Sequence, residues 1–369
     1  MAEPSTYKKD SDFNINFHGR TSDYQTAVWF ENALHGTDQL RQRIALALSE
    51  LMVISGKKQR TRFRGDSLAG YYDLMAKHAF GNFRTLMGDI SRSPGMGLFL
   101  SHQGNKKYSS SSNTHPDENF ARELMQLFTM GLWEMNQDGS MVKDSSGNPI
   151  PSYTQDDVEE LAKVMTGYDL KGNSKYGRTN RGSGEEWSSP MEFTSDHHEY
   201  ASKTLLGTTI SSGTSSSSEP ADLDKALDII FQHQNVAPHV SKHLITRLVT
   251  SNPSSSYINR VSTVFNNDGG GVRGNLKAVV RAVLMDHEAR GLYYRNQENY
   301  GKPKELLLAF TQFLRAFGVQ KLDGWKSRTG ASMKGVYQFY YLENVLGQAP
   351  LRSDTVFNFF AADFVPADS

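Results

Sequence analysis

Apolar side chains recur at helical spacing along most of the chain. Between Leu40 and Met52, for example, Ile44, Leu48 and Leu51 are spaced three or four residues apart. Residues at this spacing share one face of an α-helix, so the pattern predicts a helix there. Equivalent patterns predict helices over residues 66–80, 82–90, 94–102, 117–129, 154–167, 222–233, 236–251, 253–266, 275–288 and 304–317.

Three shorter stretches depart from the helical period. Residues 132–153 contain Asp138-Gly139 and Ser146-Gly147, which are turn signals between short extended runs and predict a hairpin or ribbon. Residues 191–193 and 204–206 have the pattern of short strands. Few strands among many helices predict a mainly α fold, which we expect to be a multi-helix orthogonal bundle with a small β-hairpin and short-strand insertion.

Composition along the chain predicts four parts. Residues 1–24 form a polar N-terminal extension, and residues 25–210 form a helical subdomain that carries the β insertion and the candidate site. Residues 211–218 are Ser-rich and predict a linker. Residues 219–369 form a second helical subdomain. We expect it to be truncated at its C-terminus, because the run from Phe357 to Phe364 is strongly aromatic and requires a partner surface.

Charge and cysteine content exclude several classes of function. The 369 residues include 40 basic and 40 acidic ones, so no net charge attracts nucleic acid, and we expect no nucleic-acid partner. The absence of cysteine excludes disulfides, thiolate nucleophiles and zinc-thiolate sites. No stretch is apolar enough for a membrane span, and the first residues lack the apolar core of a signal peptide.

The candidate site lies on the helix predicted over residues 117–129. At 100° per residue, its polar residues fall within an arc of roughly 140°, while the large apolar residues face the other way. The polar residues on this arc are Glu118, Asn119, Arg122, Glu123, Gln126 and Thr129. Two carboxylates, a guanidinium and two amides are unusual on a solvated helix face, so this face is a candidate functional surface.

Paired carboxylates on this face indicate acid–base chemistry. Arg122 is four residues from Glu118 and can pair with it, while a second carboxyl group such as Glu123 is expected to be shielded by apolar neighbours, and such a difference between two carboxyl groups is what acid–base work needs. The alternative is a structural network of the same residues that ties two helices together. The residue pattern leaves both hypotheses open.

Histidines provide two further candidates. His198 and Lys203 lie in a polar loop between the predicted strands, and a metal site there would need a further ligand such as Glu123. His239 and His243 are spaced i,i+4, which suits two metal ligands, but no glutamate follows His239 as in the metalloprotease motif. We therefore expect these two to be a chance pair on a solvated face, and we predict no metal site and no cofactor.

Six segments in this order resemble one protein family. They are LRQRIALALS from residue 40, PDENFARELMQLFT from residue 116, YTQ at 153–155 leading to TGY at 166–168, NVAP from residue 235, RLVTSNP from residue 247, and Lys302-Pro303 with Glu305. In combination they resemble the bacterial domain-of-unknown-function 1800 family (DUF1800), over about residues 25–365. Glu118, Arg122, Glu123, His198 and Lys203 fit the polar motifs of that family.

The resemblance carries expectations about context. Family members are typically exported, large and helical, and often occur beside a sulfatase-like protein, so we expect a periplasmic or extracellular protein and a partner of that kind. We expect this chain to be an internal fragment that lacks the signal peptide of the longer member. Many members have Glu where Gln126 stands, and Gly301 occupies the position where the late motif has Lys, with Lys302 one place later.

Two hypotheses of function follow. The first is a hydrolase-like enzyme acting on a polysaccharide or other envelope polymer, with Glu123, Glu118 and His198 as catalytic residues. In this hypothesis Arg122, Asn119, Lys203, Trp133 and Trp187 bind the substrate, the two tryptophans by stacking on sugar rings. The second is a non-catalytic envelope or assembly protein whose polar helix is a structural network.

Overall fold

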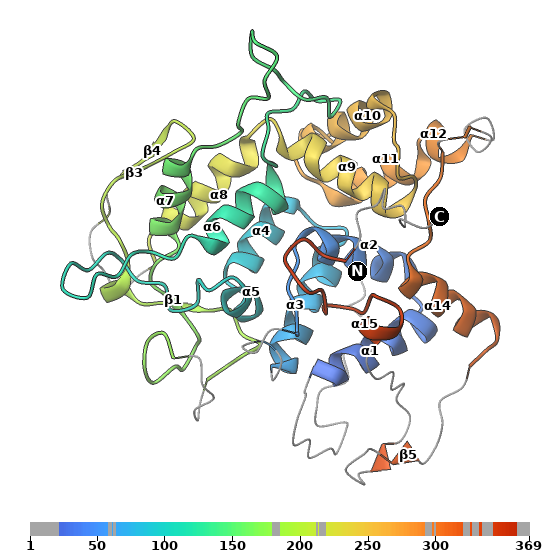
Figure 1. Cartoon of the computed structure of the whole chain (residues 1–369), viewed down its shortest axis with the longest axis horizontal. Coiled ribbons are helices and arrows are strands. Elements are labelled where there is room, and N and C mark those ends of the chain that lie inside the picture. Colours follow the sequence, from blue (N-terminus) through green and yellow to red (C-terminus); the bar gives the residue numbers. More distant parts are fainter. Residues whose placement is uncertain are drawn as a thin grey trace.

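Helices form most of the regular structure in the computed structural model of this chain (Figure 1). The structure describes residues 22–57, 61, 64–178, 185–211, 213, 219–291, 297–298, 300–319, 325–326, 332–333 and 342–359. The helices are α1 (Ser22–His35), α2 (Gln39–Leu51), α3 (Gly65–His78), α4 (Phe83–Ser91), α5 (Pro94–Phe99), α6 (Asn119–Glu123), the π-helix η2 (Leu124–Thr129), α7 (Gln155–Val164), the 3₁₀-helix η3 (Ser195–His197), α8 (Asp222–Gln232), α9 (Val236–Leu248), α10 (Ser255–Asn266), α11 (Leu276–Met285), α12 (His287–Arg290), α14 (Leu306–Ala316) and α15 (Leu342–Val345). The predicted mainly α class is confirmed.

The described strands are short and pair only in twos. Three antiparallel sheets consist of β1 (Tyr168–Asp169) with β2 (Glu192–Phe193), β3 (Lys203–Leu205) with β4 (Thr208–Ile210), and β5 (Trp325–Lys326) with β6 (Ser332–Met333). The strands predicted near residues 191–193 and 204–206 correspond to β2 and β3. The small β component of the predicted fold is therefore confirmed.

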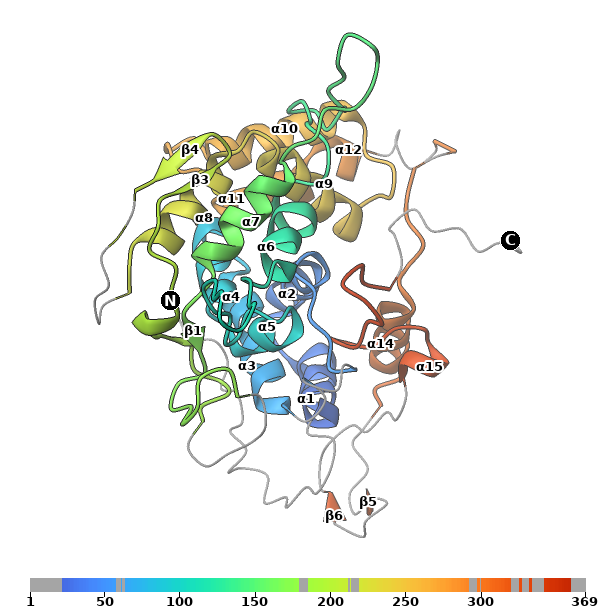
Figure 2. The same ribbon diagram turned by 60° about the vertical axis from the view of Figure 1, so that its left-hand side comes forward.

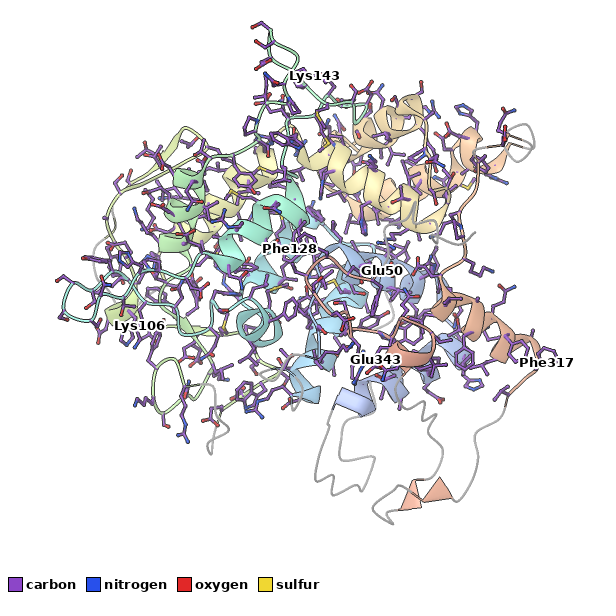
Figure 3. The ribbon with its side chains drawn as sticks, in the orientation of Figure 1. Glu50, Lys106, Phe128, Lys143, Phe317 and Glu343 are labelled. Carbon is purple, nitrogen blue, oxygen red and sulfur yellow. The ribbon has the colours of Figure 1, made fainter. Side chains whose placement is uncertain are left out.

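The predicted ribbon between residues 132 and 153 projects from the helices, with Lys143 near its tip (Figures 1 and 3). Isolated bridges pair Trp133 with Pro151 and Met135 with Met141. Gly139 has a φ of 78°, a value that glycine adopts readily and other residues rarely do. The turn signals in the sequence therefore correspond to the real turns of this ribbon.

Local capping explains where several helices begin. Asn82 accepts a hydrogen bond from the backbone N–H of Arg84 at the start of α4. Thr154 and Asp157 form a reciprocal capping box at the start of α7. A side-chain acceptor at these positions satisfies backbone N–H groups that have no partner within the helix.

Both predicted subdomains contribute to one hydrophobic core. A single cluster of buried side chains extends from Trp29 on α1 to Leu351 after α15, and it includes residues of α2, α4, α8 and α9. In Figure 2 helix α8 lies against α4 and α7, and helix α9 lies against α2. Most of the Ser-rich linker predicted at 211–218, residues 1–21 of the predicted extension and residues 360–364 of the aromatic run lie outside the described residues. None of the described helices is long and apolar enough to cross a membrane.

The C-terminal part returns to the N-terminal helices. Helix α14 packs against α1, where the rings of Phe30 and Phe310 meet edge to face with centroids 6.1 Å apart. Beyond α15, the backbone N–H of Gly56 donates to the carbonyl of Leu351 at 2.8 Å. These contacts place α14 beside α1 and the segment around Leu351 just beyond the end of α2.

Candidate functional site

On the polar face predicted for residues 117–129, Glu118 and Arg122 form an ion pair at the protein surface. Arg122 Nη2 donates to Glu118 Oε2 at 2.8 Å and to Gln155 Oε1 at 3.0 Å, and Gln155 Nε2 donates to Glu118 Oε2 at 2.9 Å. The Glu118 and Arg122 side chains are 36% and 37% exposed, and Asn119 is exposed beside them. An accessible i,i+4 pair of this kind contributes about 0.3–0.5 kcal/mol to stability.

The predicted helix changes geometry after Glu123. Residues Leu124–Thr129 form a π-helix, in which hydrogen bonds span five residues instead of four. The polar arc calculated for a uniform α-helix therefore does not continue past Glu123. Gln126 accepts a hydrogen bond from the Tyr153 hydroxyl at 2.9 Å. Burial raises the pKa of Tyr153, while the charge of Arg122 lowers it and that of Glu123 raises it, so this hydroxyl lies within electrostatic reach of both.

His198 and Lys203 belong to a second, buried cluster. Both side chains are fully covered, and Lys203 Nζ donates to Asp222 Oδ2 on α8 at 2.7 Å and to two backbone carbonyls. His198 Nδ1 lies 2.8 Å from the Thr166 carbonyl, and its Nε2 lies 3.5 Å from Asp222 Oδ2. Burial acts to raise the pKa of Asp222, but hydrogen bonds from His198 and Lys203 hold it below its usual value.

Glu118 and Arg122 are thus tied to α7, whereas His198 and Lys203 are tied to α8. From the sequence we expected these four residues to share one site. In the structure they belong to two different polar clusters. Asp222, which completes the buried cluster, was not among the predicted site residues.

The two predicted sugar-stacking tryptophans have different surroundings. Trp133 lies on the ribbon and is 40% exposed. Trp187 is only 5% exposed, and the guanidinium of Arg64 lies 4.0 Å from the centroid of its ring. Trp187 also lines a cavity of about 160 Å³ together with Lys77 and Arg92. One face of Trp187 is therefore occupied by a cation.

His239 and His243 are not on a solvated face, which corrects the expectation from the sequence. Both are half-buried, and each places Nε2 2.8 Å from a backbone carbonyl, that of Leu127 for His239 and that of Ala47 for His243. Burial, followed by the charge of Arg247, lowers the pKa of His243 to about 3. Across the part of the chain that the structure describes, no three His, Asp or Glu side chains group as metal ligands.

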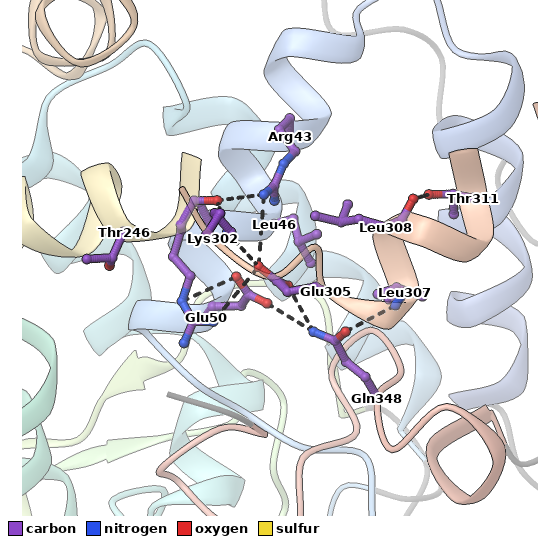
Figure 4. Close-up of polar contacts among 12 residues, drawn as sticks. Arg43, Leu46, Glu50, Thr246, Lys302, Glu305, Leu307, Leu308, Thr311 and Gln348 are labelled. Carbon is purple, nitrogen blue, oxygen red and sulfur yellow. Dashed lines mark hydrogen bonds and ion pairs between the residues drawn. The ribbon is translucent and has the colours of Figure 1, made fainter. Parts of the chain in front are cut away.

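A pair of carboxyl groups that the sequence did not single out lies between α2 and the start of α14 (Figure 4). Glu50 and Glu305 are joined by a side-chain hydrogen bond, and their side chains are 5% and 8% exposed. Gln348 Nε2 donates to Glu305 Oε2 at 2.9 Å and to Glu50 Oε1 at 3.3 Å. The pair is therefore bridged both directly and through an amide.

Three basic side chains surround this carboxyl pair. Lys302 Nζ lies 3.3 Å from Glu305 Oε1, and nitrogens of Arg43 and Arg247 each lie 3.9 Å from the same oxygen. Arg247 Nε also lies 3.7 Å from Glu50 Oε2. All three cations converge on the pair, and Glu305 is the nearer carboxylate to two of them.

The two carboxyl groups differ in protonation. Burial, reinforced by the charge of Glu305, raises the pKa of Glu50 to about 8. Burial also acts to raise the pKa of Glu305, but the hydrogen bond to Glu50 and the charge of Arg43 outweigh it and hold that pKa at about 2. Near neutral pH, Glu50 is therefore the protonated member and Glu305 the ionised one.

A small cavity opens beside Glu50. It has a volume of about 10 Å³ and is lined by Glu50, Ser49 and Gln348 as well as by the segment from Ala349 to Ser353. A cavity needs roughly 10–15 Å³ to hold one water molecule that has polar partners. The pair therefore has a polar, water-sized space at its side.

Sequence segments quoted above for the family resemblance meet at this pair. Arg43 comes from the first segment, Arg247 from the fifth, and Lys302 and Glu305 from the last, while Glu50 directly follows the first. The sequence signal for this cluster was therefore the set of separate segments, since no single helix face displays it. Glu118, Arg122 and Gln155 likewise unite the second and third segments.

Comparison with known proteins identifies the family of this chain. A family model described as "Protein of unknown function (DUF1800)" matches residues 12–369, which is nearly the whole chain. Searches among curated proteins and among solved structures gave no significant match. The chain is thus a member of the DUF1800 family.

Proposed function

We propose that this protein is a hydrolase-like enzyme in which Glu50 and Glu305 form the acid–base pair. The observation that carries the proposal is the hydrogen bond between two buried carboxyl groups whose pKa values are displaced in opposite directions, to about 8 and about 2. Two carboxyl groups held in different protonation states can act as acid and base in one reaction. This moves the paired-carboxylate hypothesis from Glu118 and Glu123 to a pair with the required asymmetry.

In hydrolysis at this pair, Glu305 acts as the base and Glu50 as the acid. A water molecule attacks the scissile centre and gives a proton to the Glu305 carboxylate, while Glu50 gives its proton to the leaving oxygen. The bond to the leaving group breaks, and the elements of water are added across it. Proton transfer from Glu305 to Glu50 along their hydrogen bond then restores the starting state.

The proposed substrate class follows from the family resemblance and from the positive charges around the carboxyl pair. Three cations face one ionised carboxylate near neutral pH, so the surroundings of the pair favour a substrate with negative character. A polysaccharide or other envelope polymer, met by an exported protein beside a sulfatase-like partner, fits that requirement. Trp133 on the exposed ribbon supplies an accessible aromatic face for a sugar ring.

A substrate screen with matched variants tests the proposal. The full chain is assayed against acidic and neutral polysaccharides for release of reducing ends, together with E50Q, E305Q and the surface control E192Q. Glu192 is exposed on β2. We expect E50Q and E305Q to lose activity by about 10²-fold or more, since each removes one proton-transfer partner, while E192Q keeps it. Circular dichroism and thermal melts establish that each variant is folded.

Two outcomes would contradict the proposal. If E123Q abolishes turnover and folded E50Q does not, the acid–base pair lies on α6. If no substrate is turned over by the full-length protein with its neighbouring partner, the second hypothesis, a non-catalytic envelope or assembly protein, takes its place. The Glu118–Arg122 ion pair and the buried cluster of Lys203 with Asp222 favour that alternative, because in both the charged groups are already paired with each other, as in structural networks.

A further inference from the structure

A cavity of about 200 Å³ lies between α1, α2 and α14 and is separate from the small space beside Glu50. Trp29 of α1, Leu46 of α2 and Leu308 of α14 supply its apolar lining. Arg43 of α2 and Arg315 of α14 supply two guanidinium groups. We propose that this cavity binds a small ligand that carries one anionic group on a short apolar body.

The charge of the lining selects for an anion. Besides the two arginines, the described lining residues include amide and hydroxyl side chains but no carboxylate. Arg315 is exposed at the rim, and its Nη1 donates a hydrogen bond to the carbonyl of Ala33 at 3.1 Å. A planar guanidinium presents several N–H donors at once and so suits carboxylate or phosphate oxygens.

Arg43 has an unused donor. Its Nη2 donates to the Arg247 carbonyl at 2.6 Å and lies 3.9 Å from Glu305 Oε1. Its Nη1 is buried and has no hydrogen-bond acceptor among the described residues. A buried charged donor without an acceptor is costly, and an anionic oxygen in the adjoining cavity would remove that cost.

Size and apolar lining define the rest of the ligand. Drug-sized ligands occupy pockets of about 300–1,000 Å³, so this cavity fits a smaller molecule. Trp29 is 6% exposed, and its indole N–H is already satisfied by the Tyr72 hydroxyl at 2.9 Å, so it offers the ligand an apolar surface. This cavity is distinct from the space beside the proposed hydrolytic pair, and ligand binding here does not depend on hydrolysis there.

Calorimetric titration with three matched probes tests this inference. Hexanoate, hexyl phosphate and hexanol share one apolar chain and differ in the polar group. We expect at least one anion to bind at a single site and hexanol to bind about tenfold more weakly or worse, because it lacks the charge. The stronger of the two anions identifies the headgroup as carboxylate or phosphate.

Variants locate the site. R315Q changes an exposed rim residue and should weaken binding of the preferred anion about fivefold to tenfold, and R43K should do the same by removing the forked donor. R281Q, at an exposed arginine on α11, is the matched control and should leave binding unchanged. Equal binding of hexanol and the anions, no binding of either anion, or full binding by folded R315Q would each overturn the inference. R315Q decides the case if R43K fails to fold.

Discussion

Folding raises the proton affinity of the Glu50 carboxyl group. The pKa of this carboxyl group is raised from 4.5 to about 8 by burial and by the nearby charge of Glu305. A raised carboxyl pKa contributes stability that is complete below the unfolded value and is lost as the pH rises through the folded value. Glu305, whose pKa is lowered to about 2, behaves in the opposite sense and contributes above its unfolded value of 4.5.

The stability of the wild type should therefore fall between about pH 5 and pH 8, by up to about 1.4 kcal/mol per pH unit from Glu50 alone. The variant E50Q should show a flatter dependence, because its amide does not titrate. Urea unfolding at several pH values measures both slopes. D73N is the companion control, since burial raises the pKa of Asp73 to about 7 and this group titrates in the same window. Equal slopes for wild type and E50Q would contradict the assignment.

Lys203 and Asp222 form a buried ion pair. Replacing it by Met leaves the Asp222 carboxylate without its 2.7 Å partner. We expect K203M to lower the free energy of unfolding by about 3–5 kcal/mol, as for other broken buried ion pairs. Denaturant titration measures the loss. The double variant K203M/D222N should recover part of it, and a K203M protein as stable as wild type would exclude a structural role for the pair.

At the scale of the element, the sequence predicted most helices because their signals are local. The apolar stripe of α2 and the caps of α4 and α7 lie within a few residues of the ends that they define. Helix α1 was not predicted. The π-helix was also missed, because the choice between four-residue and five-residue hydrogen bonding is not encoded in apolar spacing. Tertiary contacts hold its end, where Asn235 donates to the carbonyls of Met130 and Trp133.

The capping box of α7 allows a direct test. Thr154 accepts from the backbone N–H of Asp157, and the Asp157 carboxylate accepts from that of Thr154. We expect T154A to reduce the free energy of unfolding by about 1 kcal/mol, and T154S to retain most of it because the hydroxyl is kept. Chemical denaturation of the three proteins measures the difference. A T154S variant as unstable as T154A would show that the methyl group, and not the cap, carries the effect.

The candidate site was harder to predict than the helices. Glu50 and Gln348 are 298 positions apart, and Arg43 and Arg247 are 204 apart, so no local pattern relates them. The helical face around Glu118 had a visible pattern, yet its charges pair with each other at the surface. Residue type and spacing therefore identified a polar face, whereas only the assembled fold brings together the groups with displaced pKa values.

At the scale of the whole molecule, one core joins the parts that the sequence divided at the Ser-rich stretch. Helix α8 packs against α4 and α7, and α9 packs against α2. The same continuous cluster includes side chains on both sides of that stretch. A shared core couples the stability of the two parts.

Calorimetry should accordingly record a single unfolding transition for residues on both sides of the stretch at 211–218. The calorimetric and van't Hoff enthalpies should agree, as they do for one cooperative unit. K203M should shift the entire transition to lower temperature. Two resolved transitions, of which K203M moves only one, would show that the parts unfold independently.

The bridge from Gln348 to Glu50 also has a consequence for the order of synthesis. Helix α2 leaves the ribosome early, but Lys302, Glu305 and Gln348 emerge only after most of the chain. Until then Arg43 and Arg247 lack the carboxylate that they share in the folded protein. Nascent chains stalled before residue 302 should therefore remain sensitive to protease, and chains released beyond residue 359 should become resistant. Translation would then finish before the earliest helices reach their final state.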